Sequence, residues 1–210
     1  MFRSALFALS LAALLPGCAA LSALGGAATP LDAYDLQAPL NGPQARGRAS
    51  ARQLVVELPT APGALNTDRI LIRPNPLQAA YLPDVKWAEE TPTMVQTLLV
   101  RSLEDSNAFR YVGRRPLGAS GDYAIVTDLT DFQAEAAPDG KSANIRLRLT
   151  ARLVREDDAA ILSSRSFIAT AAVGSTQTLD LVAGFNLANQ TLMTDVTAWV
   201  LQSLNIPTKR

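Results

Sequence analysis

Residues 143–154 read ANIRLRLTARLV, and this stretch has the most regular pattern in the chain. Apolar side chains occupy the odd-numbered positions from Ala143 to Leu153, and polar ones occupy the even-numbered positions from Asn144 to Arg152. Successive side chains of a β-strand point to opposite faces of the sheet. The pattern therefore predicts an antiparallel strand with one face in the core and the other face in water.

The segments around this strand predict its neighbours. Residues 122–136 also alternate, but the apolar parity shifts at Phe132, which indicates a β-bulge. The sequence PDGK at 138–141 has the turn residues of a hairpin. The sequence REDDA at 155–159 forms a second turn before a strand at 160–173. Together these segments predict a three-stranded antiparallel meander.

Shorter strands and two helices are predicted in the rest of the chain. The first helix begins with Thr91 as its N-cap and Pro92 in its first turn, and it ends near Asn107. The second helix covers residues 178–204. The predicted short strands are 33–39, 53–59, 69–74 and 109–113, with two short extended pieces in 81–87.

The apolar positions of both helices recur at helical spacing on one face. Strands come first, then a helix, a strand, the meander and the last helix. This order predicts a single-domain α+β fold, in which a mixed, mainly antiparallel sheet has two helices packed on one face. The apolar stripes are Met94, Val95, Leu98, Leu99, Ser102 and Leu103 in the first helix, and Leu181, Phe185, Ala188, Leu192, Val196 and Trp199 in the second.

The composition argues against several classes of function. The 19 basic and 19 acidic residues cancel, so no strong field attracts nucleic acid. The chain has no histidine, which is the commonest general base and transition-metal ligand. Ser163, Ser164 and Ser166 therefore have no histidine to activate them. Asp128 and Asp131 lie on opposite faces of a regular strand, although a bulge would change this. We assign no catalytic residue, metal site or cofactor, and we expect no enzyme.

The N-terminal segment has the features of an exported lipoprotein. Arg3 precedes an apolar run at 5–15, which is shorter than the roughly 20 residues that a membrane span needs. The sequence LPGC, which ends at Cys18, resembles the lipobox, in which the cysteine receives a diacylglycerol before cleavage. The predicted divisions are a lipoprotein signal peptide at 1–17, a lipidated cysteine and flexible tether at 18–31, and a domain at 32–206.

Two alternatives remain for this segment. One is an ordinary signal peptide with a chance cysteine, and the other is an uncleaved anchor that continues through residues 20–28. The anchor would place Pro16 inside a helix, which costs about 3 kcal/mol. Acylation, with palmitate as an expected acyl chain, would use the single cysteine, Cys18. Because Ala19 follows it and not aspartate, we expect an outer-membrane protein that faces the periplasm.

The order and spacing of several segments resemble the ABC-type transport auxiliary lipoprotein component family, the PqiC-like lipoproteins. The resemblance runs from Tyr34 to Val200 and covers most of the chain after the leader. The most specific pieces are Asp68-Arg69 before a strand, Trp87 shortly before Pro92, and Asp131-Phe132-Gln133. These pieces lie within a longer series of matching segments. The segments are YDLQAP at 34–39, LNTDRILIRPNPLQAAYLPDVKWAEETPTMVQTLLVRSLEDSNAF at 65–109, DYAIVTDLTDFQAE at 122–135, RLTARLV at 148–154, RSF at 165–167 and TAWV at 197–200.

This resemblance implies partners that the residue pattern alone does not supply. Family members are similar to partners of Mce-type (MlaD-like) substrate-binding proteins and their ABC transporters, which are associated with moving phospholipid or other hydrophobic cargo between membranes. The auxiliary lipoprotein is not the ATPase, and this sequence has no G-x-x-x-x-G-K-[ST] phosphate loop. The resemblance leaves the formation of a homo-oligomer open.

Three arginines and a tyrosine are candidates for contact with a partner or a lipid headgroup. Arg146, Arg148 and Arg152 share the polar face of the predicted strand, and arginine binds phosphate in a bidentate way. The alternative is an ordinary solvated sheet face. Tyr81 lies in a proline-containing segment that suits a binding loop, while Trp87 in the same segment is expected to pack in the core.

Two other classes of function remain as alternatives. An envelope-assembly or pilotin-like lipoprotein would chaperone an outer-membrane complex and would not serve lipid transport. A histidine-free hydrolase would need a deep pocket lined by convergent carboxylates.

Overall fold

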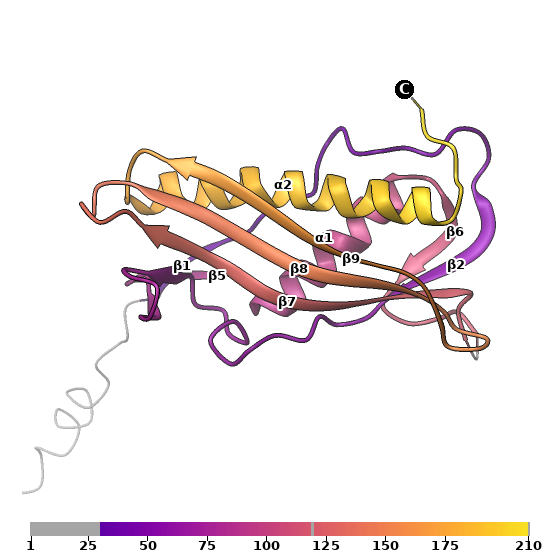
Figure 1. Cartoon of the computed structure of the whole chain (residues 1–210), viewed down its shortest axis with the longest axis horizontal. Helices are drawn as coiled ribbons and strands as arrows, with labels where there is room; N and C mark the ends of the chain where they lie inside the picture. The colour runs from indigo at the N-terminus through magenta and orange to yellow at the C-terminus, as the bar shows by residue number, and fades with distance from the viewer. Residues whose placement is uncertain (1–29, 119, 210) are drawn as a thin grey trace, which may run out of the picture. The chain divides into compact units, whose positions relative to one another are not determined.

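The computed structural model of the chain describes residues 30–118 and 120–209. The predicted signal peptide, Cys18 and most of the predicted tether lie outside these residues. Nine strands and two helices follow one another in the described part of the chain (Figure 1). The elements are β1 (Asp32–Tyr34), β2 (Ser50–Val56), β3 (Leu71–Arg73), β4 (Ala80–Tyr81), β5 (Val85–Trp87), α1 (Thr91–Asp105), β6 (Phe109–Gly113), β7 (Tyr123–Ala136), β8 (Ala143–Arg155), β9 (Ala160–Val173) and α2 (Thr178–Ser203).

The three long strands β7, β8 and β9 form the predicted antiparallel meander. The pairing of β7 with β8 runs from Tyr123 opposite Arg155 to Ala136 opposite Ala143. The register shifts between Leu129 and Asp131, and this shift is the predicted bulge. The β8 residues alternate between buried odd and more exposed even positions, as their sequence predicts.

The other edge of β7 is divided between two short strands. β2 lies parallel to the beginning of β7, and β3 lies parallel to its end. β6 extends the sheet beyond β2, and β4 extends it beyond β3. β1 and β5 form a separate parallel pair. The main sheet is therefore mixed, and the long antiparallel ladders make up most of it.

Both helices pack on one face of the main sheet. α2 runs along the long strands and contacts β8 and β9, while α1 contacts β2, β6 and α2 (Figure 1). A β-carbon on Gly184 of α2 would lie 2.4 Å from the Val173 side chain and 3.0 Å from that of Ile145. Glycine therefore allows the helix to approach the sheet closely here. Neither described helix combines the length and the apolar character that a membrane span requires.

An aromatic cluster joins the sheets and α2 in the core. The Trp87 ring of β5 lies edge-on to Phe132 of β7 and to Phe185 of α2, with centroid separations of 6.1 and 5.2 Å. Phe132 and Phe185 stack at 5.6 Å. All three side chains are fully buried. This confirms the core position expected for Trp87 and ties the small β1–β5 sheet to the main core.

The structure corrects two local predictions. Thr91 is the first helical residue and not the N-cap, because Glu90 holds that position without a side-chain cap bond. The Thr91 hydroxyl donates instead to the Thr67 carbonyl at 3.0 Å. The first strand is also shorter than predicted: its pairing with β5 ends at Tyr34, opposite Trp87.

Candidate functional site

The candidate site is the face of β7 and β8 that points away from the helices. We call this surface the outer face. Because both helices pack on the opposite side of the sheet, neither helix covers it. Its side chains come from the even-numbered positions of β8 and from the β7 residues opposite them. The outer face comprises Asp128, Asp131, Gln133, Glu135, Arg146, Arg148 and Arg152.

The bulge places two carboxylates together on the outer face. Thr130 is the extra residue, so Asp128 and Asp131 point to the same side although they are three positions apart. Asp131 accepts an ion pair from Arg146 at 3.0 Å, and Asp128 accepts one from Arg152 at 2.6 Å. Because of the bulge, the two carboxylates do not take the opposite faces of a regular strand, and they hold two of the three predicted arginines.

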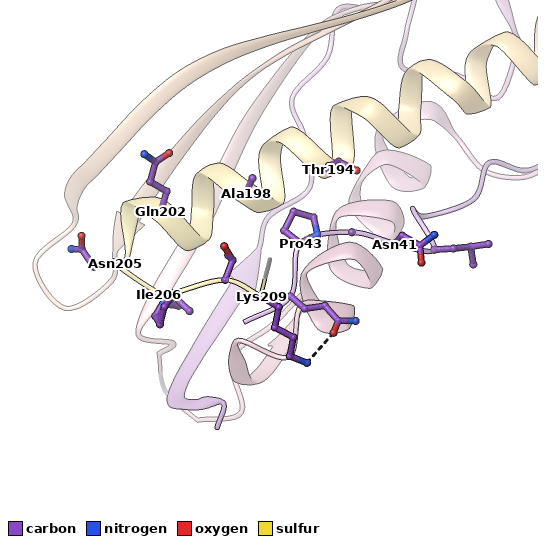
Figure 2. Close-up of a pocket in the computed structure, with 13 residues that line it drawn as sticks. Asn41, Pro43, Thr194, Ala198, Gln202, Asn205, Ile206 and Lys209 are labelled. Atoms are coloured by element: carbon purple, nitrogen blue, oxygen red, sulfur yellow. Dashed lines mark hydrogen bonds between the residues drawn. The ribbon is translucent and has the colours of Figure 1, made fainter. Parts of the chain in front are cut away.

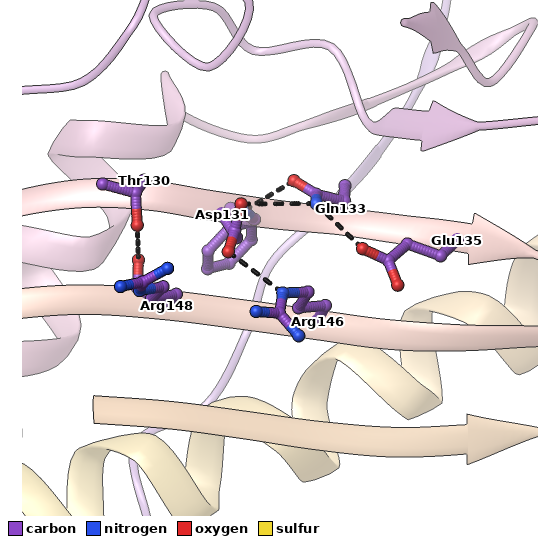
Figure 3. A network of polar contacts seen from close by, with 7 residues as sticks. Thr130, Asp131, Gln133, Glu135, Arg146 and Arg148 are labelled. Carbon is purple, nitrogen blue, oxygen red and sulfur yellow. Dashed lines mark hydrogen bonds and ion pairs between the residues drawn. The ribbon is translucent and has the colours of Figure 1, made fainter. Parts of the chain in front are cut away.

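A glutamine links the acidic residues along β7. Gln133 is almost fully buried, and its amide donates to Glu135 at 3.2 Å and to Asp131 at 3.5 Å (Figure 3). The Gln133 carbonyl oxygen accepts the Phe132 backbone N–H at 3.2 Å. A hollow of about 630 Å³ lies beside this network and is also lined by Arg73 and prolines. The network fixes the side chains of this part of the outer face before any partner arrives.

The ion pair at Asp128 has a further hydrogen bond that affects its protonation. The Thr60 hydroxyl donates to the Asp128 carboxylate at 2.5 Å. This bond and the bond from Arg152 hold the pKa of Asp128 below its ordinary value of 3.8, against a smaller opposing effect of burial. Asp128 is therefore ionised at neutral pH and serves as a counter-ion.

Replacing Asp128 by asparagine is expected to lower the free energy of unfolding at pH 7 by about 0.5–1 kcal/mol, because the pair is more than a third exposed. The folded-state pKa is depressed, so this stabilisation is present above about pH 4 and disappears as pH falls below 3.8. Urea unfolding of both proteins from pH 7 to pH 2.5 measures the difference.

The control for this experiment is Asp195→Asn, at an exposed position on α2. The free energy of unfolding of this control should follow that of the parent over the same pH range. If the free energy of unfolding of Asp128→Asn differs from that of the parent by the same amount from pH 7 to pH 2.5, the assigned role of Asp128 is wrong.

Arg148 differs from the other two arginines of the outer face. It lies opposite Asp131 in the strand register, yet Asp131 pairs with Arg146. Arg148 is exposed, and it makes no ion pair within residues 30–118 and 120–209. Its guanidinium is thus the part of the outer face best placed to meet an anionic group from outside.

Tyr81 does not join the arginines. It lies on β4, and β3 and β7 separate β4 from β8 in the sheet. Its hydroxyl donates to the Ala64 carbonyl at 3.1 Å, and the Arg69 guanidinium lies 5.9 Å from its ring centroid. Tyr81 is 39% exposed. Because two strands lie between it and β8, Tyr81 and the outer-face arginines do not form one site.

A second surface feature is an open groove beside α2 (Figure 2). It has a volume of about 1000 Å³. Three segments line it: residues 40–44, the outward side of α2 and the C-terminal residues 205–209. Lys209 donates to Gln44 at 3.1 Å across one end. Amides, hydroxyls, apolar side chains and the Lys209 ammonium line the groove, and no carboxylate is among the lining side chains.

No cluster of three or more potential acidic, histidine or cysteine ligands is present among the described residues.

The counter-ions of the arginines were missed from the sequence, although a signal exists. The turn at 138–141 sets Ala136 opposite Ala143, and counting outward from there places Gln133 opposite Arg146. The parity shift before Phe132 then turns Asp128 to the same side as Asp131. The groove had no comparable signal, because its three segments are distant in sequence.

Comparison with known proteins identifies similar chains. Residues 34–197 match the family model described as ABC-type transport auxiliary lipoprotein component. A curated protein of Bradyrhizobium diazoefficiens, described as uncharacterized, is 29% identical over an alignment of 185 residues, and the match covers 84% of this chain. The chain spans about half of that relative, 47% of its length.

Two crystal structures share the fold. The first is protein XCC0632 from Xanthomonas campestris, assigned to family DUF330. It has a TM-score of 0.72 and 24% identity, and the match covers 83% of this chain and 96% of that protein. The second is described as an uncharacterized protein. It has a TM-score of 0.64 and 15% identity, covering 81% of this chain and 98% of that one. At these identities the two matches show the α+β fold.

Proposed function

Since the chain belongs to the ABC-type transport auxiliary lipoprotein component family, we propose that it is a non-catalytic, membrane-anchored component of a Mce-type ABC transport system. The cargo is phospholipid or another hydrophobic molecule that moves between membranes. The chain supplies a docking surface, and a separate ATPase supplies the energy. The partner is a Mce/MlaD-like substrate-binding protein together with its transporter.

The sequence supports attachment through Cys18. In this proposal the signal peptide at 1–17 is removed, acyl chains on Cys18 enter the outer membrane, and the tether at 18–31 holds the domain at 32–206 on the periplasmic side. A short flexible tether confines the domain at an effective concentration that reaches roughly the millimolar range. Weak docking contacts are then sufficient for a stable assembly.

The observation that carries the proposed docking role is the arrangement of the outer face. Asp131 holds Arg146 in place, and Asp128 holds Arg152. Arg148, which lies between these two arginines on β8, is exposed and makes no ion pair with a described residue. The carboxylates are engaged as counter-ions, so they are poorly placed to exchange protons in a reaction. A fixed polar surface with one available cation suits recognition of an anionic group on a partner.

Replacing Arg148 by glutamate is expected to weaken binding to the Mce-domain protein of the same genome by about tenfold or more, because the charge at the contact is reversed. The fold should be unaffected, since Arg148 is exposed. Biolayer interferometry with the acylated chain in detergent measures the affinity.

The matched control is Arg101→Glu, an equally charged change at an exposed position on α1. This variant should bind like the parent. If no Mce-domain protein binds the parent chain while its tag is accessible, the proposed function is wrong. If both variants lose the same affinity, the assignment of the outer face is wrong.

A further inference from the structure

The far edge of the main sheet is formed by a long strand that has a strand partner on one side only among the described residues. β9 runs from Ala160 to Val173, 14 residues, and it pairs with β8 alone. The strands at the other margin, β4 and β6, have two and five residues. No backbone–backbone hydrogen bond joins β9 to a described segment other than β8. Every second residue of β9 therefore points its N–H and C=O away from the sheet.

β9 has few of the features by which proteins protect an edge strand. Charged side chains, prolines and bulges normally block the addition of another strand. A register shift at Leu162 and the charge of Arg165 lie in the first half of β9. Residues 166–173, SFIATAAV, contain no charge, proline or glycine, and Ile168 is 52% exposed. The second half of β9 is thus open to backbone pairing.

The edge is also held in a fixed conformation. Phe167 packs edge-on against Trp199 of α2 with ring centroids 5.6 Å apart. The Trp199 indole N–H donates to the Ser163 hydroxyl at 3.1 Å. Gly184 lets α2 approach Val173 at the end of the same strand. A template that is ordered before binding loses little conformational entropy when a strand is added.

The charges beside the edge favour an acidic occupant. Arg165 is exposed, its guanidinium lies 5.0 Å from the Phe167 ring centroid, and it forms no ion pair with any residue in the described ranges. On the opposite face, Arg148 lies next to Ile168 in the strand register. Positions 165 and 168 are three apart on β9, so they face opposite sides of the sheet. A second copy of β9 would bring another arginine and no carboxylate.

We propose that β9 binds an extended segment of a partner protein by β-strand addition, and that this segment carries two acidic residues three positions apart. Backbone hydrogen bonds along 166–173 supply the pairing, as in other strand-addition complexes. One acidic side chain lies beside Arg165. The other lies on the opposite face beside Ile168, on the side of the sheet where Arg148 of β8 is exposed. The proposal does not depend on the transport function, because it concerns the edge strand itself.

The test uses the acylated full chain in detergent and two synthetic acetylated nonapeptides. The first, VTVEVTETV, has glutamates three positions apart, and the second, VTVKVTKTV, has lysines in their place. We expect the glutamate peptide to bind at least about tenfold more tightly than the lysine peptide in fluorescence anisotropy. We also expect it to slow hydrogen exchange at β9 amides.

Arg165→Glu is expected to abolish or reverse the preference between the peptides. The matched control is Arg110→Glu, an exposed position on β6 at the other margin of the sheet, which should leave the preference unchanged. Equal binding of both peptides, binding of neither, or protection at β6 in place of β9 overturns the proposal. A dimer in sedimentation that Ile168→Lys dissociates also overturns it, because the edge would then bind a second copy.

Discussion

Replacing Trp87 by alanine is expected to lower the free energy of unfolding by about 3–5 kcal/mol. The Trp87 side chain is 1% exposed and touches both Phe132 and Phe185. Its removal leaves a cavity that the surrounding strands cannot fill, since β5 is held in a short sheet of only two strands. The loss also removes the aromatic contacts that join this small sheet to Phe132 and Phe185 in the main core.

Equilibrium unfolding in urea, followed by circular dichroism, measures this effect. Leu117→Ala is the control, because Leu117 is 66% exposed and its truncation should change the free energy of unfolding by less than about 0.5 kcal/mol. A double-mutant cycle of Trp87→Ala with Phe185→Leu tests the aromatic contact and should give a coupling of about 0.5–1.5 kcal/mol. A loss below 1 kcal/mol for Trp87→Ala would show that the cluster does not hold the two sheets together.

Replacing Cys18 by serine is expected to abolish acylation of the chain, and with it the acyl anchor at the membrane. Each buried CH₂ of an acyl chain contributes about 0.8 kcal/mol, and stable anchoring needs more than one chain. Serine has no thiol to receive a diacylglycerol.

Membrane fractionation of the native host, together with intact mass spectrometry, measures this result. The parent should remain with the membranes and carry the mass of its acyl groups, whereas Cys18→Ser should lose that mass. Ala19→Ser changes the next residue, keeps the thiol and serves as the control. A free Cys18 thiol in the parent, or a leader still attached to it, contradicts the lipoprotein assignment.

The local pattern of the sequence predicted most of the elements. The alternation at 143–154 and the two turns beside it define a meander that depends on neighbouring segments only. The strands at 109–113 and 160–173 have the predicted bounds, and both helices end within two residues of prediction. These features were accessible because short-range periodicity and turn chemistry determine them.

Features that depend on distant segments could not be read in the same way. The parallel pairing of β7 with β2 and β3, and that of β1 with β5, joins segments separated by many residues. Their sequences indicate strands but carry no marker of the partner. The groove beside α2 likewise needs residues 40–44 to meet the C-terminal end of the chain. The outer-face ion pairs were accessible in principle, but only through the position of the bulge.

The bulge in β7 gives this strand a tolerance for changes in length at one position. A deletion elsewhere in β7 turns every side chain on one side of the gap to the wrong face. Loss of Thr130 alone would leave Leu129 opposite Leu149 and Asp131 opposite Arg148, as they are now. Phe132 would stay inside and both aspartates would stay outside. Loss of one codon at this point would therefore leave the buried and the solvated residues of β7 on their present faces.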